Sequence, residues 1–189
     1  YKNENFGFRN FFVRLNHQID FSFFRQARAS GVVIGKENYL FEQAYIDAYY
    51  GKDFIGYDKV NEYLKRLKQI QDTLQKKGKL FILVFAAGKA SFYPEYIPDD
   101  LKTKMMPSNY SAFSAAAKTF GINTIDFNKY FTEQKNKSRY PLYPQLGIHW
   151  SNYGAIKAFD SISSYIEQKL QVNLPDIKIG LTFGAEPLP

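Results

Sequence analysis

Residues 78–88 read Gly-Lys-Leu-Phe-Ile-Leu-Val-Phe-Ala-Ala-Gly, and the eight apolar residues 80–87 are the longest such run in the chain. An apolar run without alternation is typical of a strand that is covered on both faces in a parallel sheet. It is far shorter than the ~20 residues that a membrane-spanning helix needs. The run therefore predicts a buried strand and no membrane span.

The sequence on either side of this run repeats one order of elements. A helix is expected to begin at Asp58 as its N-cap and to end before Gly78. Further along, Ser108 is expected to cap another helix, and residues 122–127 then resume as a strand. Two successive units of helix, glycine and strand favour an α/β fold over an α+β fold.

Three more elements are expected outside these units. Spacings of three, four and seven between apolar residues predict an aromatic amphipathic helix over residues 8–27. That helix either packs on the domain, which we favour, or lies on a membrane or a partner. Residues 31–41 predict a β-hairpin, and a last helix is expected from Ser151 or Asn152 to about residue 170, before a short apolar segment at 177–179.

Composition excludes several classes of protein. The chain has 189 residues, which favours one domain, and it has no cysteine, so disulfides, thiolate zinc sites and a cysteine nucleophile are excluded. With only two histidines, we expect no metal or cofactor. The net charge of +7 fits an acidic partner or simple solubility; without a recognised motif we expect no nucleic-acid binding. Because the chain opens at Tyr1 without Met, we expect a processed or trimmed product.

Candidate site residues follow the ends of the predicted strands, where open parallel sheets bind their ligands. Lys89, Ser91 and Tyr93 come directly after the first strand, where all three could face a ligand. The residues alone favour Lys89 as a structural or anion-facing cation. Ser91 lacks the sequence surroundings of a known serine nucleophile, so a catalytic role is not expected for it. Asp126 ends the second strand, where capping of the next helix is favoured over orienting a histidine.

His149 lies immediately before the last predicted helix and beside Trp150, the only tryptophan. An unperturbed imidazole pKa of about 6.5 suits proton transfer near neutrality. The residues alone favour a hydrogen-bonded structural histidine over a general base. His17 is not expected to be catalytic, and the lysines at 76, 77 and 79 are expected to be a solvated helix end.

Four stretches in this order resemble the SGNH-hydrolase-like domain of the alginate O-acetyltransferase family, the AlgX/AlgJ-type proteins. They are Phe-Arg-Asn at 8–10, Val-Ile-Gly-Lys-Glu-Asn-Tyr-Leu-Phe at 33–41, Lys-Ala-Ser-Phe-Tyr-Pro-Glu at 89–95 and His-Trp-Ser-Asn-Tyr-Gly-Ala at 149–155. The resemblance implies a three-layer α/β/α domain with a mainly parallel sheet. We expect an N-terminal helix at 1–30, the domain at 31–170, and at 171–189 a tail or the start of a missing portion.

The resemblance also implies a function. It implies acyl transfer to an exported polysaccharide by a Ser-His-Asp triad, with His149 as the base. Substrate binding would fall to Lys89, Ser91, Tyr93, Trp150 and Asn152. It also implies a polysaccharide partner, which the charge suggests is anionic, and a membrane-associated biosynthetic complex. The expected place is the periplasm or another extracytoplasmic part of the envelope, with anchoring through a missing N-terminal segment.

Two departures from the family pattern change that expectation. Gly147 stands where the family has its triad Asp, and no nucleophilic serine turn occurs between residues 154 and 189. We therefore expect this chain to be catalytically silent, either as a fragment of a longer enzyme or as a degenerate relative. Asp126 is the remaining candidate carboxylate. The alternative function is a non-catalytic glycan-binding or scaffolding module.

Overall fold

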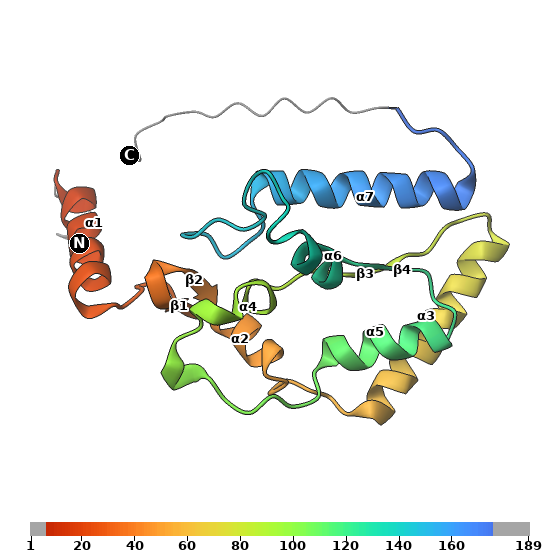
Figure 1. Cartoon of the computed structure of the whole chain (residues 1–189), viewed down its shortest axis with the longest axis horizontal. Helices are drawn as coiled ribbons and strands as arrows, with labels where there is room; N and C mark the ends of the chain where they lie inside the picture. The colour runs from red at the N-terminus through yellow and green to blue at the C-terminus, as the bar shows by residue number, and fades with distance from the viewer. Residues whose placement is uncertain (1–6, 176–189) are drawn as a thin grey trace.

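The computed structural model describes residues 7–175. The apolar segment predicted at 177–179 and most of the predicted tail lie outside the described residues. Two layers of helices enclose a short parallel strand pair, so the domain has three layers, and an N-terminal helix stands beside it (Figure 1). The α/β class is confirmed.

The strand pair is smaller than the sequence suggests. β3 (Leu83–Phe85) pairs in parallel with β4 (Thr124–Asp126), and in the described chain this sheet has two strands. The expectation of a strand over 80–87, covered on both faces, is wrong: Val84 is 39% exposed. Backbone pairing needs a neighbour, and β4 is long enough to pair with only three residues of the apolar run.

Helices cover the two faces of this pair (Figure 1). One layer is formed by α3 (Tyr57–Lys76) and α5 (Asn109–Thr119), and the other by α6 (Phe127–Gln134) and α7 (Asn152–Leu170). Each layer has its own apolar cluster against the strands. The buried members are Val60, Leu64, Ala112, Ala117 and Ile122 on the first side, and Ala87, Phe92, Phe127, Phe131, Leu142, Tyr143 and Ala158 on the second.

The helix ends follow from local hydrogen bonding. Ser108 forms a capping box with Ser111 at the start of α5, and the Ser151 hydroxyl accepts from the Gly154 amide at 2.9 Å at the start of α7, as predicted. The predicted cap at Asp58 is wrong, because the N-cap of α3 is Gly56, two residues earlier. Asp58 lies in the first turn, where a carboxylate still favours the helix dipole.

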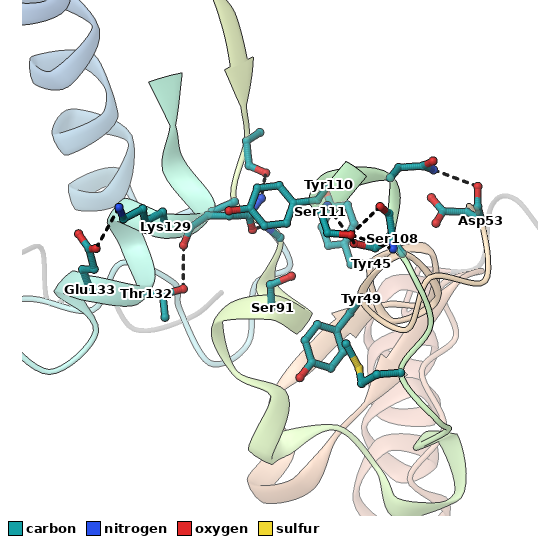
Figure 2. A pocket seen from close by; sticks show the side chains of 17 residues that line it. Tyr45, Tyr49, Asp53, Ser91, Ser108, Tyr110, Ser111, Lys129, Thr132 and Glu133 are labelled. Atoms are coloured by element: carbon teal, nitrogen blue, oxygen red, sulfur yellow. Dashed lines mark hydrogen bonds and ion pairs between the residues drawn. The ribbon is translucent and has the colours of Figure 1, made fainter. Parts of the chain in front are cut away.

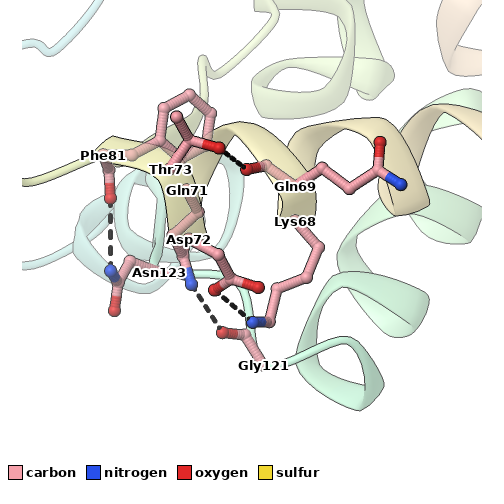
Figure 3. Close-up of polar contacts among 8 residues, drawn as sticks. All are labelled: Lys68, Gln69, Gln71, Asp72, Thr73, Phe81, Gly121 and Asn123. Atoms are coloured by element: carbon pink, nitrogen blue, oxygen red, sulfur yellow. Dashed lines mark hydrogen bonds and ion pairs between the residues drawn. The ribbon is translucent and has the colours of Figure 1, made fainter. Parts of the chain in front are cut away.

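A buried amide joins helix and strand at the amino edge of the sheet (Figure 3). Gln71 of α3 is 6% exposed. Its side chain donates to the Gly121 carbonyl at 3.0 Å and accepts from the Asn123 amide at 2.8 Å. Asn123 in turn donates to the Phe81 carbonyl at 3.2 Å. These bonds fix the turn between α5 and β4 against α3.

The predicted hairpin is present, and several short elements were not predicted. β1 (Val32–Ile34) and β2 (Leu40–Glu42) pair antiparallel. A third apolar cluster lies beneath the hairpin, around Phe41 and Ile46. The unpredicted elements are α2 (Gln43–Tyr49), α4 (Lys89–Phe92) and the 3₁₀ turns η1 (Lys36–Asn38), η2 (Pro94–Tyr96) and η3 (Asp99–Leu101).

The predicted aromatic helix is α1 (Arg9–Phe24). It stands at one end of the molecule beside the hairpin (Figure 1). The favoured expectation that it packs its apolar face on the domain is wrong: its one buried residue is Asp20, and its large apolar side chains other than Phe21 are exposed. Within residues 7–175, no helix combines the length and apolarity needed to cross a membrane.

Candidate functional site

The loop before α7 is fixed to the end of β3 by a shared acceptor. The Trp150 indole donates to the Ala87 carbonyl at 3.0 Å, and the Tyr143 hydroxyl donates to the same oxygen. Burial is the main reason that the pKa of Tyr143 is well above its usual value, so the phenol stays a donor. The Ser151 amide also donates to the Leu142 carbonyl at 2.9 Å. The loop is therefore held at the carboxyl edge of the sheet.

Lys89 holds the same loop from beneath. Its side chain is fully buried, and Nζ donates to the carbonyls of Pro144, Gln145 and Gly147 at 2.7, 2.9 and 2.6 Å. Burial lowers the pKa of this amine to about 8. An ammonium has three donors, and all three are used. The structure therefore gives Lys89 a positioning role, which fits the expectation of a structural cation, and its role in substrate binding stays a prediction.

His149 lies at the rim where the loop meets the strand end. It lines a cavity of about 360 Å³ together with Tyr45, Ala86, Ala87 and Trp150. The side chain is exposed, and within the described residues its ring makes no hydrogen bond or ion pair. The hydrogen-bonded structural histidine that the residues alone favour is therefore not what the structure shows.

His149 also borders a second cavity. This cavity, of about 580 Å³, lies between the loop and α1, and His17 lines it as well. It thus brings together the chain's two histidines, although 132 positions separate them in sequence, the difference between 149 and 17. No group of three or more His, Asp or Glu side chains suited to a metal ion occurs in residues 7–175.

A larger groove of about 790 Å³ continues along the carboxyl edge (Figure 2). It shares Tyr45, Ala86 and Ala87 with the cavity at His149. Ser91 faces this groove, as expected from its place after β3. Phenol, hydroxyl, amide and charged side chains make up most of the remaining wall: Tyr49, Asp53, Ser108, Asn109, Tyr110, Ser111, Asn128, Lys129, Thr132 and Glu133.

Asp126 caps α6, as predicted. Its carboxylate accepts from the Lys129 amide at 3.0 Å and from the Tyr110 hydroxyl at 2.9 Å. Burial, and then the bond to Asp126, raises the pKa of Tyr110 to about 12. In the described chain no hydrogen bond joins Asp126 to His149, so the geometry supports the capping role.

The remaining predicted site residues divide into two groups. Trp150 lines the His149 cavity, so its ring is placed where a ligand could contact it. Tyr93 is packed among other rings, with centroids 4.5 Å from Phe92 and 5.0 Å from Tyr39. Asn152 is exposed at the first turn of α7 and belongs to neither cavity wall.

Sequence reasoning missed Asn128, which organises the end of β3. Its side-chain oxygen accepts from the Gly88 amide at 3.2 Å, and its nitrogen donates to the Ala86 carbonyl at 3.1 Å. An Asn placed two residues after the strand-ending Asp126 was the only available signal. The two hydrogen bonds fix the backbone of the turn after β3, where the groove and the His149 cavity meet.

Gly147 has little free space around its Cα. A Cβ added there would stand 2.7 Å from Pro144 Cγ. Its carbonyl is one of the three oxygens bound by Lys89. A larger residue at 147 would therefore require the proline ring, and the loop that carries it, to move.

Comparison with known proteins agrees with this geometry. The chain is 24% identical over 155 residues to the probable alginate O-acetylase AlgJ of Pseudomonas putida and 25% identical over 158 residues to that of Pseudomonas aeruginosa. The matches cover 82% and 83% of this chain but 38% of each relative. The chain thus spans less than half the length of these relatives.

Two solved structures share the fold. The O-acetyltransferase domain of Pseudomonas putida AlgJ matches with a TM-score of 0.59 and 23% identity, over 77% of this chain and 50% of that one. Pseudomonas aeruginosa AlgX matches with a TM-score of 0.51 and 21% identity, over 72% and 32% of the two chains. Residues 32–182 match the family model of the SGNH hydrolase-like domain of the acetyltransferase AlgX. The hairpin, the strand pair and the loop that presents His149 thus belong to one recognised unit, and the chain is a member of the AlgX-type SGNH hydrolase-like family.

Proposed function

We propose that this chain carries the histidine of an acyl-transfer site for a cell-envelope polysaccharide, and that the 189-residue chain itself is catalytically silent. One observation carries the proposal. His149 borders an open cavity at the carboxyl edge of β3, and in the described chain its ring forms no hydrogen bond to a serine or a carboxylate. The residue that would move the proton is present without its two partners.

The chemistry explains why the partners matter. Acyl transfer by a serine requires the base to lie about 2.6–3.2 Å from the hydroxyl whose proton it removes. A carboxylate normally holds the imidazole in the correct tautomer, and in serine proteases its loss lowers the rate by about 10⁴. Ser91 faces the larger groove and makes no hydrogen bond to His149.

An ester-hydrolysis assay tests this proposal. The 189-residue chain and the variant His149→Ala are compared with para-nitrophenyl acetate as the ester. We expect no saturable turnover from either form, because an imidazole without a serine and a carboxylate can attack this activated ester only in the slow, non-saturable way that free imidazole does. Since His149 is exposed, its loss does not threaten the fold. Turnover that disappears in His149→Ala would overturn the claim of silence.

A second candidate function is binding of a glycan without turnover. The large groove favours it, because phenol rings of Tyr45 and Tyr49 lie beside amide and hydroxyl groups in a volume of about 790 Å³. Aromatic rings with a polar end suit the faces of sugar rings. Ligand sites commonly have volumes of about 300–1,000 Å³.

The single tryptophan provides the readout for glycan binding. Trp150 lines the cavity that joins the groove at Tyr45, so a bound polymer should change its fluorescence. Alginate, a polyuronate, is titrated at low and high salt, with neutral dextran as the control polymer. We expect saturable binding of alginate that weakens with salt, and weaker binding by Lys129→Gln than by Lys137→Gln, because only Lys129 lines the groove. Equal affinity in the two variants would contradict binding in the groove.

The family also supports the wider setting that we propose. We place the chain in the extracytoplasmic envelope, in a complex that modifies polysaccharide, since the curated relatives are named alginate O-acetylases. We propose residues 31–170 as the domain, preceded by the helical segment 1–30 and followed by segment 171–189. The family match at 32–182 supports the first boundary.

A further inference from the structure

The outward side of α1 carries an apolar stripe, which we define as Phe11, Leu15, Ile19 and Phe23. Successive members are four residues apart, so they follow one side of the helix. Their exposed fractions are 60%, 43%, 40% and 79%. Such a row of large apolar side chains on a surface marks an interaction site.

The opposite side of α1 faces the rest of the molecule. Asp20 is the buried residue of the helix, and its carboxylate pairs with Arg28 at 2.5 Å. His17 and Phe21 line the cavity against the loop that carries His149. Because these residues face the domain, the apolar stripe is directed away from it.

Charge around the stripe is strongly positive. Residues 7–30 contain four arginines and one acidic residue, Asp20, which is already paired with Arg28. Arg9 and Arg14 flank the stripe on its two sides, by their positions in the helical repeat. Arginine stems can lie along an apolar surface while their charged ends reach phosphate groups.

We propose that α1 lies in the surface of an anionic lipid membrane, with the apolar stripe buried at the boundary of the acyl chains and the arginines at the headgroups. A helix with an apolar stripe and basic flanks binds in this way. A second copy of the chain is a poorer fit, because stripe-to-stripe contact would bring two sets of arginines together. The helix is too short and too polar to span.

Co-flotation of the full chain with vesicles tests the proposal. Vesicles of phosphatidylglycerol and phosphatidylethanolamine in equal parts are compared with vesicles of phosphatidylcholine alone. We expect binding to the anionic vesicles that weakens with salt, and little binding to the neutral ones. The double variant Phe11→Ser, Leu15→Ser should bind at least about tenfold more weakly, since it removes apolar surface from the interface.

A matched control lies on the same helix. Val13 and Phe24 are 40% and 64% exposed but lie outside the stripe, so Val13→Ser, Phe24→Ser removes a similar pair of side chains. We expect this variant to bind as the unaltered chain does. Equal losses in the two double variants would overturn the assignment of the stripe. Circular dichroism should show the same helix content in both, because all four side chains are exposed.

A charge variant keeps the test independent of helix stability. Arg9→Gln, Arg14→Gln retains the whole stripe and should lower the affinity for anionic vesicles about fivefold per residue. Binding to phosphatidylcholine as strong as to anionic vesicles would overturn the proposal. So would a dimer in solution that Phe11→Ser, Leu15→Ser abolishes while vesicle binding is absent, since the occupant would then be a second copy.

Discussion

A single residue, Lys89, fixes the loop that leads to His149. A fully buried amine normally costs folding free energy, and here it is offset by three backbone carbonyls of the segment 144–147. That segment leads directly into His149. The lysine therefore determines where the imidazole stands although it does not approach the cavity itself.

Replacing Lys89 with Met should lower the free energy of unfolding by about 2 kcal/mol, because three carbonyls lose their donor. Urea unfolding measures the loss. The fluorescence emission of Trp150 should shift to longer wavelength as the loop becomes more exposed to solvent. Lys65→Met on the exposed side of α3 is the control and should be nearly neutral. A loss no greater than the control's would remove the positioning role.

The buried amine also predicts a pH dependence. Burial lowers the pKa of Lys89 to about 8, whereas in the unfolded chain it titrates near 10.5. Between these values the unfolded state binds more protons, so the contribution of this group to stability rises with pH, by at most about 1.4 kcal/mol per pH unit. The free energies of unfolding of the unaltered chain and of Lys89→Met, measured in urea, should therefore move further apart from pH 8 upward. A difference in unfolding free energy that does not change with pH would show that Lys89 keeps its ordinary pKa.

For single residues, the sequence predicted the place of a side chain in the fold better than its function. The place of His149 before a helix and that of Ser91 after a strand followed from neighbouring residues. Lys89 has equally visible neighbours, but its role depends on the path of the loop 144–147, which is distant in sequence. No local pattern contains that information.

At the scale of elements, the long helices were predictable because their signals are local. Ser108 and Ser151 cap α5 and α7 through bonds to residues three positions away. The short elements α2 and α4 were not predictable, because tertiary contacts beneath the hairpin stabilise them. The length of β3 was overestimated, because an apolar run indicates that its residues are buried but not which of them pair with a neighbouring strand.

Asp126 allows a test of an element boundary. Asp126→Ala should cost about 1–2 kcal/mol, because α6 loses its cap and Tyr110 loses its acceptor. Asp126→Asn keeps an acceptor oxygen and should cost much less. Thermal unfolding compares the two variants. If Asn were as damaging as Ala, charge rather than capping would be the function of this carboxylate.

At the scale of the whole molecule, Tyr93 joins two apolar clusters. It packs against the cluster around Phe131 and also against the one around Phe41. Its ring contacts Phe92 on one side and Tyr39 on the other. The predicted role in substrate binding stays a prediction, whereas the packing explains why a ring is needed at this position.

Removing the ring should weaken the cooperativity of unfolding. Tyr93→Ala should cost about 3–5 kcal/mol and separate the transitions seen by Trp150 fluorescence and by far-UV circular dichroism, because Trp150 reports on one cluster only. Tyr93→Phe keeps the packing and serves as the control, with coincident transitions. Coincident curves for Tyr93→Ala would mean that the clusters unfold together without it.

The contact between Gly147 and the Pro144 ring has a consequence for protein engineering. A Cβ placed at 147 would stand 2.7 Å from Pro144 Cγ, so an aspartate fits there only if the proline ring or the loop shifts. A carboxylate two residues before His149 is therefore better installed together with Pro144→Ala than alone.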